Sequence, residues 1–158
     1  MRIAFVAFAI LSALSGPLAA APQAVDKNSC TTSKTVADRP PDDPNASSFA
    51  SPNGTWYANE TRTVWAWWWG KRMVGDYKVL WVRPVGTRLS ITGHRIDESA
   101  PPLTATVPGG SERTTFQATS ISFPTAGCWE VVAKSNESEL RFVTKVAVKS
   151  ADGEKVKR

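Results

Sequence analysis

Apolar and polar residues alternate along most of the chain after residue 54, which is the pattern of half-buried β-strands. The expected strands cover residues 55–58, 61–69, 77–82, 89–96, 103–107 and 114–122, and two more flank a turn at 134–138. Glycine and proline clusters separate these segments, and no segment after residue 21 has the period of a helix. The pattern predicts an all-β, antiparallel sandwich of about seven or eight strands, with a barrel as the alternative.

The last two expected strands form a hairpin around residues 134–138. Trp129 and Val131 follow Gly127 in steps of two, so they share one face of the first strand, which we assign to the core. Cys128 then lies on the opposite face. The return strand presents one face that should cover Trp129, formed by Leu140, Phe142, Thr144, Val146 and Val148.

The start of this hairpin resembles a strand of immunoglobulin-like sandwiches, in which a glycine, an aromatic residue and a cysteine are spaced by two. In that comparison Trp129 takes the aromatic place and Val131 the place of the cysteine. The resemblance implies that the sandwich is immunoglobulin-like.

Three segments also resemble a family of small exported bacterial proteins: residues 89–97, residues 100–103, and the Phe-Pro-x-x-Gly-Cys-Trp-Glu-Val motif at 123–131. The similarity runs from about residue 56 to residue 148. It implies a bacterial origin and an immunoglobulin-like sandwich, and it brings no known activity, cofactor or ligand residues. The hairpin is also similar to the end of exported copper-binding sandwiches, but their set of metal-binding histidines is missing from this chain, which has one histidine.

The N-terminal part of the chain is unlike the rest. Residues 1–21 combine a positive start, a short apolar run and small residues, which is the composition of a secretory signal peptide rather than of a membrane span. Residues 22–51 are rich in proline and charge and predict an extended arm. The sandwich should then occupy residues 52–150, followed by a charged tail at 151–158. We expect a periplasmic or secreted bacterial protein without a membrane span after cleavage.

Two cysteines remain after the expected cleavage, Cys30 in the arm and Cys128 on the outward face of its strand. An oxidising compartment favours disulfides, and an arm lying across the sheet would bring Cys30 to Cys128. We therefore predict a Cys30–Cys128 disulfide, with two free thiols as the alternative.

Several classes of function lack support in the composition. The formal net charge is +5, but the charges are scattered, so a nucleic-acid partner is not expected. Two cysteines and one histidine fall short of a zinc site, and we expect neither a metal nor another cofactor.

Few residues suggest catalytic chemistry. His94 and Asp97 lie three apart and should face opposite sides of a strand, and Cys128 has no neighbouring base. Arg95 and Asp97, joined by Arg83, could form a polar cluster at one end of a sheet. Such a cluster could bind a carboxylate or phosphate, or could be a structural ion pair. We predict no catalytic residues and no enzyme activity.

The tryptophans are the strongest candidates for binding. Trp65, Trp67 and Trp69 fall on one face of their strand, while Val64, Ala66 and Trp68 fall on the other. If the second set faces the core, the first forms an exposed aromatic platform suited to sugar rings or a protein partner. Two alternatives are open: the register is reversed and the three tryptophans are core, or the arm covers them.

Together these observations predict an exported, non-catalytic, immunoglobulin-like module that binds a protein or cell-envelope partner, including an envelope glycan. The alternatives are a carbohydrate-binding module that uses the tryptophan platform and a periplasmic inhibitor or immunity-type protein.

Overall fold

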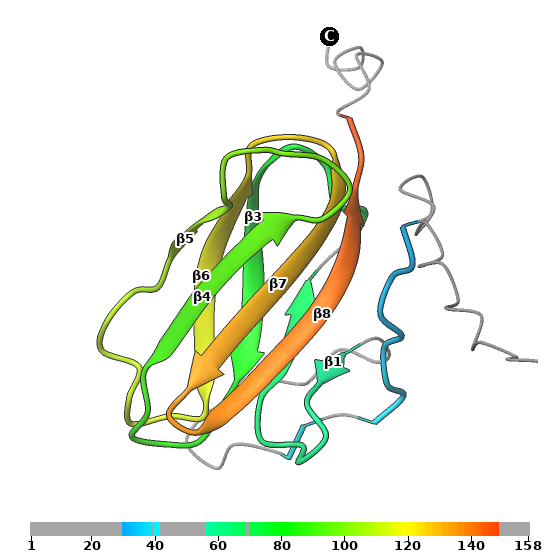
Figure 1. Cartoon of the computed structure of the whole chain (residues 1–158). Coiled ribbons are helices and arrows are strands. Elements are labelled where there is room, and N and C mark those ends of the chain that lie inside the picture. The colour runs from blue at the N-terminus through cyan, green and yellow to red at the C-terminus, as the bar shows by residue number, and fades with distance from the viewer. Residues whose placement is uncertain (1–29, 39, 42–55, 69, 149–158) are drawn as a thin grey trace, which may run out of the picture.

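The chain forms an all-β sandwich in a computed structural model that describes residues 30–38, 40–41, 56–68 and 70–148. The predicted signal peptide, most of the predicted arm and the C-terminal tail lie outside these described residues. Within them the strands are β1 (Tyr57–Ala58), β2 (Trp65–Trp68), β3 (Gly75–Val82), β4 (Leu89–Arg95), β5 (Thr104–Thr106), β6 (Phe116–Phe123), β7 (Gly127–Ser135) and β8 (Ser138–Val146). These eight strands confirm the predicted fold class (Figure 1).

The described strands form two antiparallel sheets that face each other (Figure 1). One has the order β1-β2-β3-β6-β5 and the other the order β4-β7-β8. The longest ladder is the predicted hairpin, in which β7 and β8 pair from Gly127 opposite Val146 to Ser135 opposite Ser138. Asn136 adopts a φ of 51° in the two-residue connection, a conformation that asparagine tolerates better than most residues.

One predicted strand is shorter than expected, because a turn replaces its first half. Residues 61–69 were expected to be extended, but β2 begins at Trp65. The Asn59 side chain accepts hydrogen bonds from the backbone N–H groups of Thr63 and Val64, at 2.9 and 3.0 Å. Arg62 lies in the same turn with a φ of 56°. The asparagine side chain therefore offers the backbone a local alternative to the sheet.

The core lies between the two sheets, and Trp129 is one of its largest members. Its side chain is fully buried, as predicted. Its ring packs edge-on against that of Phe123 in the opposite sheet, with the ring centroids 5.4 Å apart. Its indole N–H donates to the carbonyl oxygen of Thr125, at 3.0 Å, in the corner between β6 and β7. The predicted inward face of β8 is also buried at Leu140, Phe142, Thr144 and Val146, whereas Val148 is exposed.

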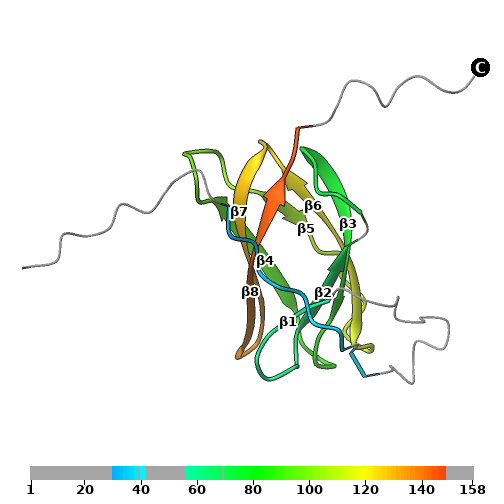
Figure 2. The same cartoon turned by 90° about the vertical axis from the view of Figure 1, so that its right-hand side faces the viewer.

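The described part of the arm fastens one side of the sandwich. Cys30 and Cys128 form a disulfide, which confirms the predicted pairing, with their Cα atoms 5.4 Å apart. Ser33 then exchanges two hydrogen bonds with Val143 on the edge of β8: its N–H donates to the carbonyl at 2.9 Å, and its hydroxyl accepts from the N–H at 2.8 Å. Val36 bridges to Trp56 next to β1, so the arm crosses from one sheet to the other (Figure 2).

None of the described residues belongs to a helix that is long and apolar enough to cross a membrane.

Candidate functional site

The predicted tryptophan platform is wrong for Trp65. The expected register is present, since Val64 and Ala66 face the core and are fully buried. Trp65 faces the other side of the sheet but is only 3% exposed, because it packs with Trp56 and Val82 in a second apolar cluster. An exposed stacking surface therefore cannot include Trp65.

Part of the cover over this face comes from the arm, which was one of the alternatives. Val36 packs against the cluster of Trp56, Trp65 and Val82. Trp67 is half-buried and its ring lies 6.2 Å from that of Trp56. The third predicted member, Trp69, lies outside the described residues. Of the predicted platform, the structure thus leaves Trp67 alone as a partly accessible ring in the described part of the chain.

The turn before β2 adds to the burial of Trp65. The indole N–H donates to the carbonyl oxygen of Arg62 at 2.8 Å, and the Arg62 guanidinium lies over the ring at 5.4 Å. Arg62 also forms an ion pair with Asp38 of the arm, at 3.3 Å. Trp65 is therefore a structural anchor between arm, turn and sheet.

The predicted cluster of Arg83, Arg95 and Asp97 is wrong in including Arg83, because Arg83 lies at the opposite end of the sandwich from the other two. Arg83 follows the last residue of β3. Arg95 is opposite Trp129 at the start of β7, and Trp129 contacts Phe123, which pairs with the first residue of β3. The length of β3, eight residues or roughly 25 Å, separates the two arginines.

Arg83 is almost completely buried, at 1% exposed, and it organises the loop between β5 and β6. Its guanidinium donates to the carbonyl oxygen and the hydroxyl of Ser111, both at 3.1 Å, and to the side chain of Gln117 at 3.2 Å. Burial lowers the pKa of Arg83, and the charge of Glu112 opposes that shift. Because these partners belong to the fold, Arg83 acts as a loop clamp.

Arg95 and Asp97 form a structural ion pair at the other end. The Nε of Arg95 donates to a carboxylate oxygen of Asp97 at 2.7 Å, and one of its terminal nitrogens lies 2.8 Å from Glu98. The hydrogen bond from Arg95 is the main reason that the pKa of Asp97 lies below its usual value. The pair lies against Gly127, where a Cβ atom would come within 2.2 Å of the Arg95 Nε.

The remaining candidates for chemistry are on the outer face of the three-stranded sheet. His94 is 62% exposed and lies 3.8 Å from a carboxylate oxygen of Glu130. Glu130 also pairs with Arg141 at 2.7 Å. Cys128 is closed by its disulfide, so it offers no thiolate. Among the described residues, no group of three or more His, Cys, Asp or Glu is placed to hold a metal ion.

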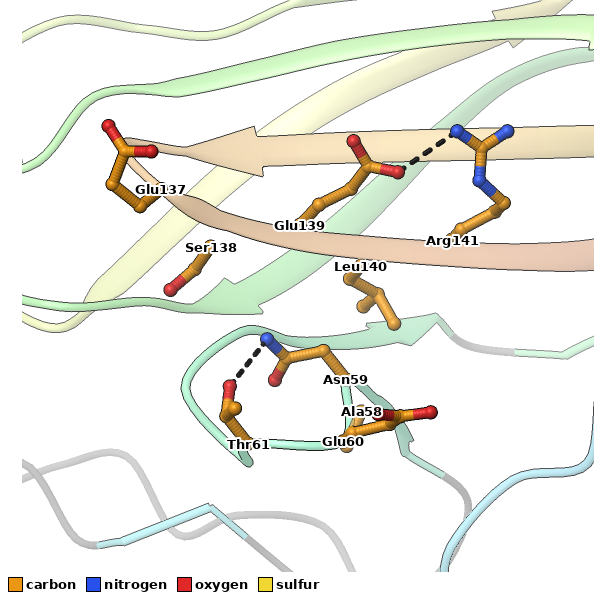
Figure 3. A pocket seen from close by; sticks show the side chains of 9 residues that line it. All are labelled: Ala58, Asn59, Glu60, Thr61, Glu137, Ser138, Glu139, Leu140 and Arg141. Atoms are coloured by element: carbon orange, nitrogen blue, oxygen red, sulfur yellow. Dashed lines mark hydrogen bonds and ion pairs between the residues drawn. The ribbon is translucent and has the colours of Figure 1, made fainter.

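A hollow of about 470 Å³ lies between the turn after β1 and the tip of the β7–β8 hairpin (Figure 3). Its rim carries the carboxylates of Glu60, Glu137 and Glu139. Glu139 is held by Arg141 at 2.9 Å and by Lys134 at 3.2 Å, and the hydrogen bond from Arg141 is the largest cause of its lowered pKa. Arg141 lines the same hollow, so its charge and that of Lys134 offset part of the negative charge of the three carboxylates.

This hollow was not predicted, because its two walls are far apart in the sequence. The rings of Tyr57 and Phe142 stack at 4.2 Å and bring β1 to β8. The hydroxyl of Thr63 donates to that of Ser138 at 3.0 Å and ties the turn to the hairpin. Neither contact can be predicted from the alternation of apolar and polar residues along a strand.

Comparison with known proteins identifies no relative. No protein-family model matches the chain. No curated protein matches it, and neither does any solved structure. The predicted kinship with small exported bacterial proteins therefore stays a prediction.

Proposed function

We propose that this protein is an exported, non-catalytic, immunoglobulin-like module that binds a protein or another cell-envelope partner. The observation that carries the proposal is that the side chains that could react or bind a ligand have structural roles instead. Arg83 clamps a loop, Arg95 holds Asp97, and Cys128 fastens the arm. A molecule built in this way offers surfaces rather than a reaction centre.

The immunoglobulin-like type is supported by strand order. Constant-type domains of that fold have the order A-B-E-D facing C-F-G. The order β2-β3-β6-β5 facing β4-β7-β8 corresponds to it strand for strand, with β1 as an addition. The bond from Trp129 to Thr125 also parallels the tyrosine corner of those domains, where an aromatic side chain at the start of strand F bonds to backbone upstream. Such folds host many functions, so this support concerns scaffold rather than ligand.

Export is supported by the disulfide, because disulfides persist in oxidising compartments such as the periplasm. Of the alternatives, a carbohydrate-binding module has lost support, because Trp65 is buried and cannot stack on a sugar ring. An inhibitor or immunity-type protein is the special case in which the partner is an enzyme.

The proposal is tested by capture from a bacterial envelope extract, with the oxidised protein as bait and Trp129→Ala, which should be unfolded, as the control for non-specific adsorption. A partner that the folded bait retains and the control does not, and that binds again after purification, supports the proposal. Turnover on a hydrolase or transferase substrate panel that disappears in His94→Ala would contradict it.

A further inference from the structure

The four edges of the two sheets are protected to different degrees. In the described residues, β8 is covered by Ser33, β1 has two residues and β5 has three. The free edge of β4 is different, because β4 has seven residues and one backbone hydrogen bond on that side, from the Leu103 N–H to the Gly93 carbonyl at 3.1 Å. Exposed strand edges are templates for pairing with another chain.

The pairing of β4 with β7 fixes which backbone groups point outward. The Ile96 N–H donates to Cys128 in β7, whereas the Gly93 carbonyl accepts from Leu103 on the opposite side. Since backbone groups alternate along a strand, Ser90, Thr92 and His94 bond toward β7. The N–H and C=O groups of Leu89 and Ile91 therefore point to the free edge, and within the described part of the chain no backbone group bonds to them there.

The sequence of this edge also lacks the usual protection. Between residues 89 and 93 there is no proline, no charged side chain and no bulge in the pairing with β7. Ser90 and Thr92 are exposed, and Ile91 is half-buried. The pairing surface ends at Gly93, where Leu103 crosses the strand. The two are so close that a Cβ atom added to Gly93 would lie 2.3 Å from the Cδ2 atom of Leu103.

A second hollow lies beside the open end of this edge. Its volume is about 200 Å³, and its lining is mixed: apolar atoms come from Leu89, Val107 and Pro108, and polar or charged ones from Thr87, Arg88, Glu112 and Gln117. A side chain from a strand paired with β4 could enter it, as occurs when a peptide adds to a sheet and a pocket reads alternate side chains.

We propose that the free edge of β4 at residues 89–92 binds an extended, acidic segment of a partner polypeptide by strand addition, with one of its side chains in the adjoining hollow. The charge of the segment follows from the positive groups that flank the edge. The Arg88 side chain is 90% exposed and its contact with Glu112 is long, at 3.9 Å; Lys134, opposite Ser90, is 60% exposed and pairs with Glu139 at 3.2 Å. The inference rests on the proposed function and names the surface that function would use.

A second copy of this chain fits the edge less well than an acidic segment. Each copy carries a formal charge of +5, so the positive groups beside the edge of one copy would be repelled by those of the other. Four open residues are also too short to bury the roughly 1,000 Å² that a stable dimer needs.

The test uses a displayed library of random short peptides, selected on the oxidised protein. We expect enriched peptides to be acidic and to bind in an extended conformation. Ile91→Pro removes an outward N–H while leaving the bonds of Ser90 and Thr92 to β7, and it should weaken binding of the selected peptides by about tenfold or more. Val143→Pro is the matched control, because it removes an outward N–H on the covered edge of the same sheet.

Amide hydrogen exchange gives a second readout that needs no variant. The Ile91 amide should exchange fast in the free protein and slowly with peptide bound, while the Thr92 amide, bonded to β7, is protected in both states. Protection at another surface, equal losses in the two proline variants, or enrichment of basic or no peptides would overturn the inference. Partner capture from envelope extract would then still decide the proposed function separately.

Discussion

Replacement of Trp129 by alanine is the sharpest test of how the fold is held together. The Trp129 side chain is 0% exposed, contacts Phe123 edge-on and donates its N–H to Thr125. Removing a buried side chain of this size costs about 3–5 kcal/mol through lost burial and the cavity left behind. The carbonyl of Thr125 loses its partner as well, which adds roughly 1 kcal/mol. A domain of this size has a total stability of about 5–15 kcal/mol, so the variant should be largely unfolded or close to it.

The assay is urea unfolding followed by circular dichroism, with the disulfide intact in every sample. Trp67→Ala is the matched control, because it removes the same atoms from a half-buried site on the outer face of β2. We expect Trp67→Ala to lower the free energy of unfolding by about 1 kcal/mol, with an unchanged m-value. Equal losses in the two variants would refute the distinction between core and outer face, and a loss below about 1 kcal/mol for Trp129→Ala would refute the packing described for it.

Three further predictions concern the disulfide, the glycine at the start of β7 and the adjoining ion pair. Cys30→Ser with Cys128→Ser opens a loop with a sequence separation of 98, so thermal and urea unfolding should show a loss of up to about 4.7 kcal/mol; an unchanged midpoint would contradict this. Gly127→Ala should cost about 1–3 kcal/mol in the same melts, because φ is 145° and the new Cβ would meet Arg95, whereas a neutral change would show that the site relaxes freely. Because its pKa is lowered in the folded state, Asp97 stabilises the fold above its unfolded pKa, and this contribution is lost as the pH falls through the folded pKa. Stability–pH curves of wild type and Asp97→Asn should therefore differ near neutral pH and converge in acid, and parallel curves would argue against the pair.

Strand positions could be predicted because they depend on local alternation. The hairpin is the clearest case: side chains two residues apart must share a face, so Trp129 and Val131 placed Cys128 on the outside. That placement, together with the expectation of an oxidising compartment, was enough to pair Cys128 with Cys30. The expected strand at 61–69 was too long because the Asn59 side chain captures the backbone N–H groups of the next turn, a contact that alternation does not register.

The candidate site was harder to predict because it depends on which elements meet. Arg83 and Arg95 are close in sequence, but one follows β3 and the other ends β4, and strands that run in opposite directions place such residues at opposite ends. Trp65 is correctly assigned to the outer face, yet Trp56 and Val36 cover it through contacts between distant segments. The open edge of β4 likewise becomes visible only once its neighbours in the sheets are known.

Titration calorimetry of the oxidised protein with a partner purified from envelope extract tests the central claim most directly, because the claim is binding without chemistry. We predict saturable heats, recovery of both components with unchanged mass, and the same affinity for His94→Ala. A heat flow that continues after saturation, with a change in the mass of the partner that depends on His94, would contradict the account.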